Sequence, residues 1–233
     1  YSYIKPKLSL NFRQYDINHG ALSSSETFAI PTTSLDSGMF FDRTLNFFGN
    51  NLTQTLEPRA FYSYTPFHDQ SMVPIYDTRL MDLNMYNIFS ENQFIGYDRI
   101  QDSNQLTTGL TSRFIDSDSV ERLSLTFAQR FYLSDRQVLN DPLYSNASSS
   151  IERASSDFLL GANAKISKDL TFRTMTQYNP EQSSTKRVQY GFKYNPHPGK
   201  LLRFDYRFIE YASTNQTRLK QITWKRVLWY WKI

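Results

Sequence analysis

Arginines that recur on one side of alternating segments are the residues best suited to bind a charged ligand. They are Arg59, Arg113, Arg122, Arg130, Arg173, Arg187, Arg203 and Arg207, with Lys165 and Lys193 on the same side. The acids on that side are chiefly Glu57 and Asp205. A guanidinium binds phosphate through paired hydrogen bonds, so this side would attract an anionic ligand. The alternative is that the arginines pair with acids from a plug or from loops, and the sequence leaves both open.

A second polar cluster lies where a long polar stretch returns to an alternating segment. It comprises Asp77, Asp98, Arg99, Asp102 and Asn104. Carboxylates beside an arginine and amides can cross-link a loop through charge-assisted hydrogen bonds, and we expect this role. A catalytic role needs a converging partner, and the histidines are scattered at His19, His68 and His197. We therefore expect no enzyme, no metal site and no cofactor.

Glu57, Pro58 and Arg59 lie inside an alternating segment. Proline cannot donate a hydrogen bond to a neighbouring strand, so Pro58 predicts a bulge, an edge or a local break. Glu57 and Arg59 share one side of the segment, where they could contact a plug or a substrate. We favour the other interpretation, in which the two side chains form an ion pair that has a structural role on this side of the segment.

The elements that must position these residues are β-strands, because the hydrophobic pattern has a period of two. In residues 187–194, Val188, Tyr190 and Phe192 alternate with Arg187 and Gln189. Similar patterns cover residues 7–15, 35–45, 52–64, 104–115, 121–133, 157–167, 170–178, 202–208 and 217 onward. These are about ten strands, mostly near the ~9–11 residues that cross a bilayer at a tilt.

The predicted connections alternate between short and long. Short turns are expected at 46–51, 116–119, 167–169 and 195–199, and long polar stretches at 16–34, 65–103, 134–156 and 179–186. Residues 211–216 are an exception, because the alternation requires a long connection there and they are a short one. Within the stretch 65–103, residues 80–90 have the apolar spacing of a short helix. Short turns on one side and long loops on the other are typical of an outer-membrane barrel, with 65–103 a long extracellular loop.

Composition excludes several classes of protein. The 233 residues include 16% aromatics, no cysteine and a formal net charge of +4. No run approaches the ~20 apolar residues of a membrane helix, disulfides are impossible, and the charge is too weak to argue for nucleic acid. A soluble sandwich would also alternate, but the polar side here carries Arg, Gln, Asn and Thr rather than Lys and Glu. We expect residues 1–233 to be a single all-β domain without a second domain.

Several motifs resemble the LptD family of outer-membrane lipopolysaccharide-assembly proteins, also known as the organic-solvent-tolerance family. They are TLEPR at 55–59, PIYDT at 74–78, FSENQFIGYDRI at 89–100, DSNQL at 102–106, LTSR at 110–113 and QRFYL at 129–133. From residue 140 onward no such motif is present, and the similarity lies only in the alternating strand pattern and in the order of short and long connections. The tail after residue 221, rich in tryptophan, departs from the family pattern.

The resemblance implies an antiparallel transmembrane β-barrel in the Gram-negative outer membrane, here about ten strands of a larger barrel. It also implies lipopolysaccharide as the cargo, a lipoprotein plug like LptE, periplasmic transport-bridge proteins and contact with outer-membrane lipid. Cargo sugars and phosphates would pass through the lumen, and the lipid chains would leave between two weakly paired strands. The start at Tyr1 without a methionine leads us to expect an internal piece, with that lateral opening outside it.

Three alternatives remain open from the residues alone. The chain could be a porin or an embedded hydrolase of the outer membrane, although a hydrolase needs a serine or aspartate near a histidine at the rim. It could also be a soluble carbohydrate-binding sandwich, which would not depend on detergent.

Overall fold

A computed structural model describes residues 1–19, 22–47, 50–138, 154–197, 199–210 and 218–228. The described chain forms one antiparallel sheet of eleven strands and a separate two-stranded pair, β5 (Arg79–Leu80) and β6 (Phe94–Ile95). The strands of the large sheet are β1 (Ser2–His19), β2 (Leu22–Met39), β3 (Phe41–Phe47), β4 (Asn50–Thr65), β7 (Ser103–Asp116), β8 (Glu121–Tyr132), β9 (Phe158–Lys165), β10 (Leu170–Asn179), β11 (Ser184–His197), β12 (Lys200–Glu210) and β13 (Arg218–Leu228).

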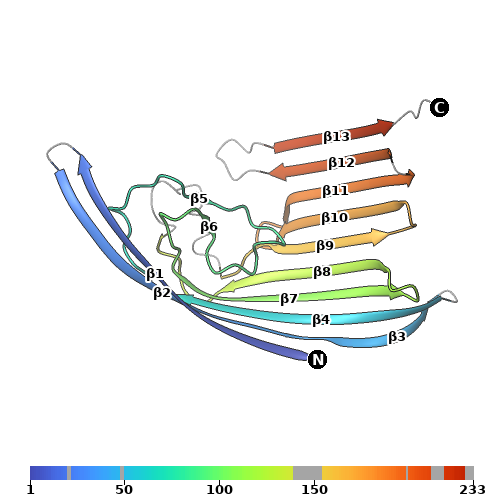
Figure 1. Ribbon diagram of the computed structural model, residues 1–233, viewed down its shortest axis with the longest axis horizontal. Coiled ribbons are helices and arrows are strands. Elements are labelled where there is room, and N and C mark those ends of the chain that lie inside the picture. Colours follow the sequence, from blue (N-terminus) through green and yellow to red (C-terminus); the bar gives the residue numbers. More distant parts are fainter. Residues whose placement is uncertain (20–21, 48–49, 139–153, 198, 211–217, 229–233) are drawn as a thin grey trace.

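The large sheet is an open, curved wall (Figure 1). Its strands pair in chain order from β1 to β13, apart from β3, which pairs with β4. Among the described residues, β1 and β13 each pair with a single neighbour. The predicted all-β, antiparallel architecture is confirmed. No helix in the described ranges is long and apolar enough to cross a membrane.

The two faces of the sheet differ as the alternation predicts. On the convex face, here called the outer face, large apolar side chains are exposed from β1 to β13; they include Leu8, Leu10, Phe12, Leu56, Leu110, Phe127, Leu160, Tyr190, Phe204, Ile222 and Trp224. The opposite, inner face carries the arginines named above. Successive side chains of a strand point to opposite faces, so the cross-strand register keeps the two sets apart over most of the sheet. The register shifts only near strand ends, after Phe114, Gln177 and Tyr194.

Pro58 interrupts the sheet without shifting it. β2 pairs with β4 as far as Gly38 opposite Arg59, and β3 resumes with Phe41 opposite Leu56, in the same register. The interval lies opposite Pro58, which has no N–H to donate to that side. The ladder to β7 on the other side continues through Pro58 opposite Leu110. Pro58 therefore produces a local ladder break, and β2 and β3 together count as one interrupted strand.

Two of the predicted long connections are wrong. Residues 16–34 belong to β1 and β2, which continue as a long hairpin joined at residues 20 and 21. Backbone pairing sustains these polar strands, and the inner-face residues Phe28 and Ile30 are buried against the segment that follows β4. The stretch 179–186 contains only a short turn, in which the Gln182 N–H donates to Asn179 Oδ1 at 2.9 Å. The short connection at 211–216, where the alternation requires a long one, lies outside the described residues. Most of the predicted loop 134–156 lies outside them as well.

Residues 80–90 do not form the predicted helix: Leu80 belongs to β5, and residues 85–89 form turns. Asn84 Oδ1 accepts hydrogen bonds from the backbone N–H groups of Tyr86 and Asn87, and Asn87 Oδ1 accepts one from Asn84. Asparagine side chains compete with helical backbone bonds in this way, so the helix-like spacing of the apolar residues is not enough to form a helix. The tail after residue 221 does form a strand as far as Leu228, since β13 pairs with β12 along its length.

Candidate functional site

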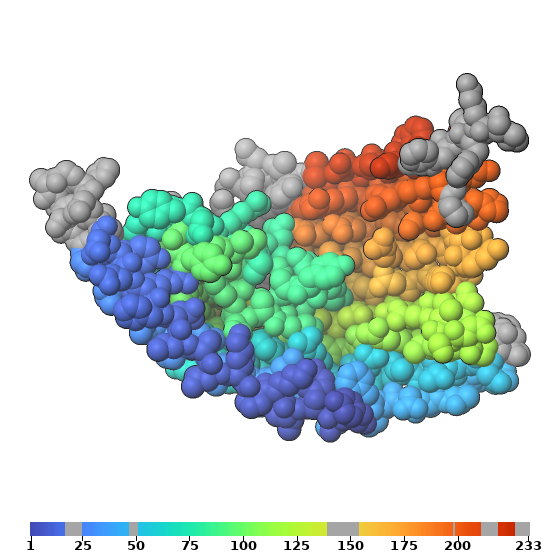
Figure 2. Space-filling model, viewed as in Figure 1, coloured from blue at the N-terminus to red at the C-terminus, as the bar shows by residue number. Residues whose placement is uncertain are grey.

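The segment between β4 and β7, residues 66–102, packs on the inner face and is called the inner segment below. Figure 2 shows it in green within the curve of the sheet. Its residue Ile88 is fully buried against Ala128 and Leu159 of the wall, with Leu83, Met85 and Phe89 around them. Gly109 makes room for this packing, because a Cβ there would lie 2.6 Å from the Phe89 ring. The inner segment therefore lines one half of the concave surface.

Arg130 of β8 is the main polar anchor of the inner segment. Its side chain is fully buried, and its Nη2 donates to the backbone carbonyls of Asn87, Ile88 and Ser90. Its Nε donates to Thr107 Oγ1 at 3.3 Å. A buried cation is tolerable only when it is hydrogen-bonded, and here neutral oxygens accept from Nε and Nη2. Its Nη1 is buried without a hydrogen-bond partner among the described residues.

Two ion pairs also join the inner segment to the sheet, one at β11 and one at β1. Arg187 of β11 lies 2.8 Å from Asp82, and Lys7 of β1 lies 2.8 Å from Glu91. Glu91 also accepts a hydrogen bond from Ser34 at 2.6 Å. The basic wall residues in contact with the inner segment are thus matched by acids or carbonyls within the same chain.

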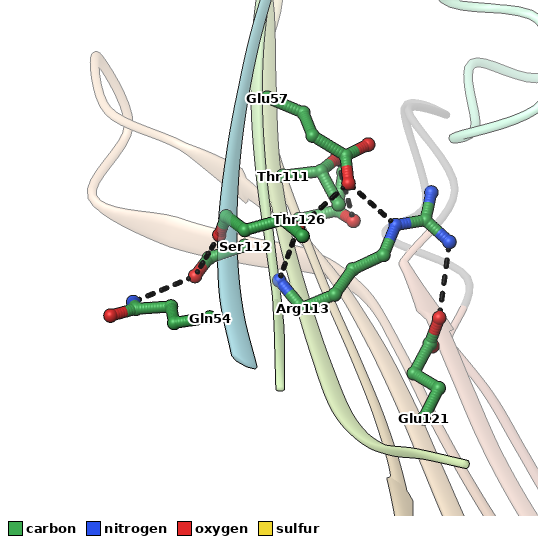
Figure 3. Close-up of polar contacts among 8 residues, drawn as sticks. Gln54, Glu57, Thr111, Ser112, Arg113, Glu121 and Thr126 are labelled. Atoms are coloured by element: carbon green, nitrogen blue, oxygen red, sulfur yellow. Dashed lines mark hydrogen bonds and ion pairs between the residues drawn. The ribbon is translucent and has the colours of Figure 1, made fainter. Parts of the chain in front are cut away.

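The arginines nearest Pro58 pair with acids of neighbouring strands. Arg59 makes two hydrogen bonds to Asp36, and its guanidinium lies 4.1 Å from the centre of the Phe89 ring. Arg113 lies 3.0 Å from Glu57 and 3.1 Å from Glu121, as Figure 3 shows. The structure therefore does not bring Glu57 and Arg59 together as one pair; each contacts a different partner.

The carboxylates of the second cluster hold backbone N–H groups. Asp98 accepts from Tyr76 and Asp77, and Asp77 accepts from Tyr97. Asp102 accepts from Gln137 and Val138 beyond β8, at 2.7 and 2.9 Å. These contacts tie distant parts of the chain to one another and place the carboxylates beside backbone groups.

The other two members of this cluster are also engaged. Arg99 is 2% exposed, and its Nη2 donates to the Val73 carbonyl at 2.9 Å. Asn104 Oδ1 accepts a hydrogen bond from the Tyr62 hydroxyl at 3.0 Å.

Asp98 gives a testable pH dependence. Burial tends to raise its pKa, but the N–H groups of Asp77 and Tyr76 outweigh burial and hold the pKa below its ordinary value. A carboxyl with a lowered pKa stabilises the fold above its unfolded pKa, about 3.9, and loses this contribution as the pH falls through the folded value. We expect protection of the Tyr76 and Asp77 amides to be level between pH 7 and pH 5 and to fall below about pH 4. Hydrogen exchange, corrected for intrinsic rates, measures this.

The matched variant is Asp98→Asn, which keeps an acceptor oxygen but not the charge. We expect it to lower protection of these two amides by about fivefold at neutral pH, because charge-assisted bonds are stronger than neutral ones. It should also abolish the acid step. A step of unchanged size in the variant would show that another group is responsible.

Sequence reasoning missed the acids that partner the basic wall. Asp36 shares the inner face with Ser34 and Gly38, so the alternation in β2 could have identified it. Asp82 and Glu91 lie in irregular chain, where no periodicity assigns a direction. Gln70 was also missed; it is buried and makes two hydrogen bonds with the Ile100 backbone.

The remaining predicted arginines make no ion pair or hydrogen bond with the described residues of the inner segment. Arg122 pairs with Asp116 at 2.5 Å, and Arg203 makes two hydrogen bonds with Asp205 of its own strand. Arg173 and Arg207 have no ion pair or hydrogen bond with any described residue. Both line a hollow of about 560 Å³ on the inner face of β8 to β13, bordered by Met85 and Tyr86 of the inner segment.

Comparison with known proteins gives a consistent result. The sequence model of a family described as LptD, LPS transport system D, matches residues 1–228. A protein of Chromobacterium violaceum named LPS-assembly protein LptD is 38% identical over 232 residues, which cover 95% of this chain and 28% of that protein.

Proteins of the same name in two other organisms are similar. The Paracidovorax citrulli protein is 40% identical over 210 residues, covering 88% of this chain and 25% of that protein. The Thiobacillus denitrificans protein is 37% identical over 217 residues, covering 91% of this chain and 29% of that protein. The chain thus spans between a quarter and three tenths of the length of these relatives.

Proposed function

This chain belongs to the LptD family, and we propose that it is part of an outer-membrane barrel that assembles lipopolysaccharide at the surface of a Gram-negative cell. The observation that carries the proposal is the contrast between the two faces of the sheet. An exposed apolar outer face suits lipid, and a polar inner face with a folded segment on it suits a hydrated lumen. The rest of the barrel would pair with the free sides of β1 and β13.

The proposed orientation follows from the lengths of the connections. The turns after β3, β7, β9 and β11 are short and lie at one end of the sheet, on the right in Figure 1. The two long connections, from β4 to β7 and from β8 to β9, lie at the other end, together with the short connections after β1 and β10. Outer-membrane barrels have short turns on the periplasmic side, so we place the first of these ends there. The connection at about 65–103 is then a long extracellular loop that folds back into the lumen.

The proposed action is transport without covalent chemistry. The carboxylates of Asp77, Asp98 and Asp102 are occupied by backbone N–H groups, which suits a structural role better than acid or base catalysis. The proposed partners are lipopolysaccharide, a lipoprotein plug like LptE, the periplasmic proteins of the transport bridge and outer-membrane lipid. Lipid chains of the cargo would leave through a lateral opening elsewhere in the barrel.

Depletion of the full-length protein in living cells tests the proposal. We expect newly made, pulse-labelled lipopolysaccharide at the cell surface to fall by about tenfold or more and to accumulate at the inner membrane. A plasmid copy of the wild-type gene should restore delivery. Normal delivery in fully depleted cells would contradict the proposed function.

A further inference from the structure

Cations gather on the inner face of β9 to β13 in a row across the strands. The register places Lys165 opposite Thr171, Thr171 opposite Lys193, Lys193 opposite Arg203 and Arg203 opposite Lys225. Arg173 and Arg207 share this face in the next two rows, away from the short turns. We call these six residues the basic ladder: Lys165, Arg173, Lys193, Arg203, Arg207 and Lys225. With neighbouring strands about 4.8 Å apart, the row spans roughly 19 Å.

The basic ladder differs from the rest of the inner face in its lack of partners. Most other inner-face cations meet acids or carbonyls, as Arg59, Arg113, Arg130 and Arg187 do. An exception is Arg13 of β1, whose Nη1 is buried without a hydrogen-bond partner among the described residues. Within the part of the chain that the structure describes, only Arg203 of the ladder has an acidic partner, Asp205. Like charges on adjacent strands destabilise one another, so this arrangement favours an external anion.

The shape of the wall beside the ladder suits a small, hydroxylated ligand. Gly191 lies between Arg173 and Asp205 in its cross-strand row, and a Cβ there would lie 3.2 Å from Asp205 Oδ1. Gly161 lies in the adjoining row, where the Met85 side chain packs against it. The hollow is also lined by Asn163, Gln189 and Gln221. Arg207 Nε is buried there without a hydrogen-bond partner among the described residues. Amides bond sugar hydroxyls, and guanidinium bonds phosphate.

We propose that the basic ladder binds the phosphate groups of the phosphorylated saccharide of lipopolysaccharide soon after it enters the lumen. The inference rests on the proposed function and names the binding site within it. The ladder lies toward the short-turn end, which the proposed orientation places at the periplasmic entrance. A hollow of about 560 Å³ matches the size range of small-ligand sites, whereas an acidic protein would need a broad, flatter surface.

Site-specific photo-crosslinking in cells tests the proposal with the full-length protein. A benzophenone amino acid replaces Gln189 in the hollow, and its crosslinks to lipopolysaccharide are compared between two double variants. Arg173→Gln with Lys193→Gln removes two charges from the ladder. Lys220→Gln with Arg226→Gln removes two charges from the outer face of β13, opposite Phe208 and Leu202, and is the matched control. We expect the ladder variant to lower the yield about tenfold and the control to leave it unchanged.

A second measurement leaves the basic ladder unchanged and alters the lipopolysaccharide instead. Purified full-length protein carrying the Gln189 crosslinker is mixed with lipopolysaccharide or with the same lipopolysaccharide after phosphatase treatment. We expect dephosphorylation to lower the yield about as much as the ladder variant does. A yield insensitive to both changes would overturn the basic ladder as a phosphate site and leave the proposed function intact.

Two other outcomes are also decisive. Crosslinks from position 189 to a polypeptide in place of lipopolysaccharide would identify an acidic protein as the occupant and overturn the proposal. The absence of lipopolysaccharide crosslinks from every inner-face position of the wild-type barrel would instead contradict the proposed function itself.

Discussion

Replacing Arg130 with methionine is expected to release the inner segment from the wall. The variant leaves the carbonyl oxygens of Asn87, Ile88 and Ser90 without their shared donor in a buried place. Each of these carbonyls keeps a neutral donor, from Ser90, Thr107 and Gln105 respectively, so the loss is that of hydrogen bonds to a charged group. Such bonds contribute about 1.5–3 kcal/mol, and we expect local opening to become easier by about that amount. Limited proteolysis of the full-length protein in membranes should then cut within residues 66–102 at least about 10-fold faster.

Arg207→Met is the matched control for Arg130→Met. Arg207 is also an inner-face arginine, but it makes no hydrogen bond to the inner segment among the described residues. We expect its replacement to leave the cleavage rate of residues 66–102 unchanged. Equal cleavage of wild type and Arg130→Met would mean that the apolar contacts around Ile88 hold the inner segment without help from Arg130.

Replacing Phe127 with arginine is expected to destabilise the barrel in lipid. Phe127 lies mid-strand on the outer face of β8, is 36% exposed and packs on Phe158 with ring centres 5.5 Å apart. An arginine on the lipid face near the bilayer midplane costs about 2–4 kcal/mol. Urea unfolding of the full-length barrel in lipid vesicles measures the loss in free energy of unfolding.

Thr126→Arg places the same side chain one residue away, on the inner face. There the guanidinium remains hydrated, so we expect a loss below about 1 kcal/mol. The difference between the two variants reports which face meets lipid. Equal losses would refute the assignment of the apolar face to lipid.

The alternation of side chains was enough to predict most of the sheet. Residues 187–194 and 202–208 lie within β11 and β12, with Val188, Tyr190 and Phe192 on the face that was expected. The prediction failed where pairing continues without an apolar pattern. Residues 16–34 are polar, yet they extend β1 and β2, because a long hairpin satisfies its backbone hydrogen bonds whatever its side chains are.

The candidate site could be predicted only in part. The arginines of the inner face were identified from the sequence, but their sorting into paired and unpaired groups was not. That sorting depends on cross-strand neighbours such as Asp36 and on the inner segment, whose acids Asp82 and Glu91 lie in irregular chain without periodicity. The register that aligns Lys165, Lys193, Arg203 and Lys225 also requires the exact length of each turn.

The sequence by itself determined the strands, their two unlike faces and the family, because side-chain period and local motifs are properties of short stretches of chain. Only the tertiary structure decided that residues 66–102 fold onto the inner face and that Arg130 is consumed in holding them. It also decided that, of the six residues of the basic ladder, only Arg203 has an acidic partner among the described residues. These outcomes depend on contacts between residues far apart in the chain, such as Arg187 with Asp82, which no local pattern encodes.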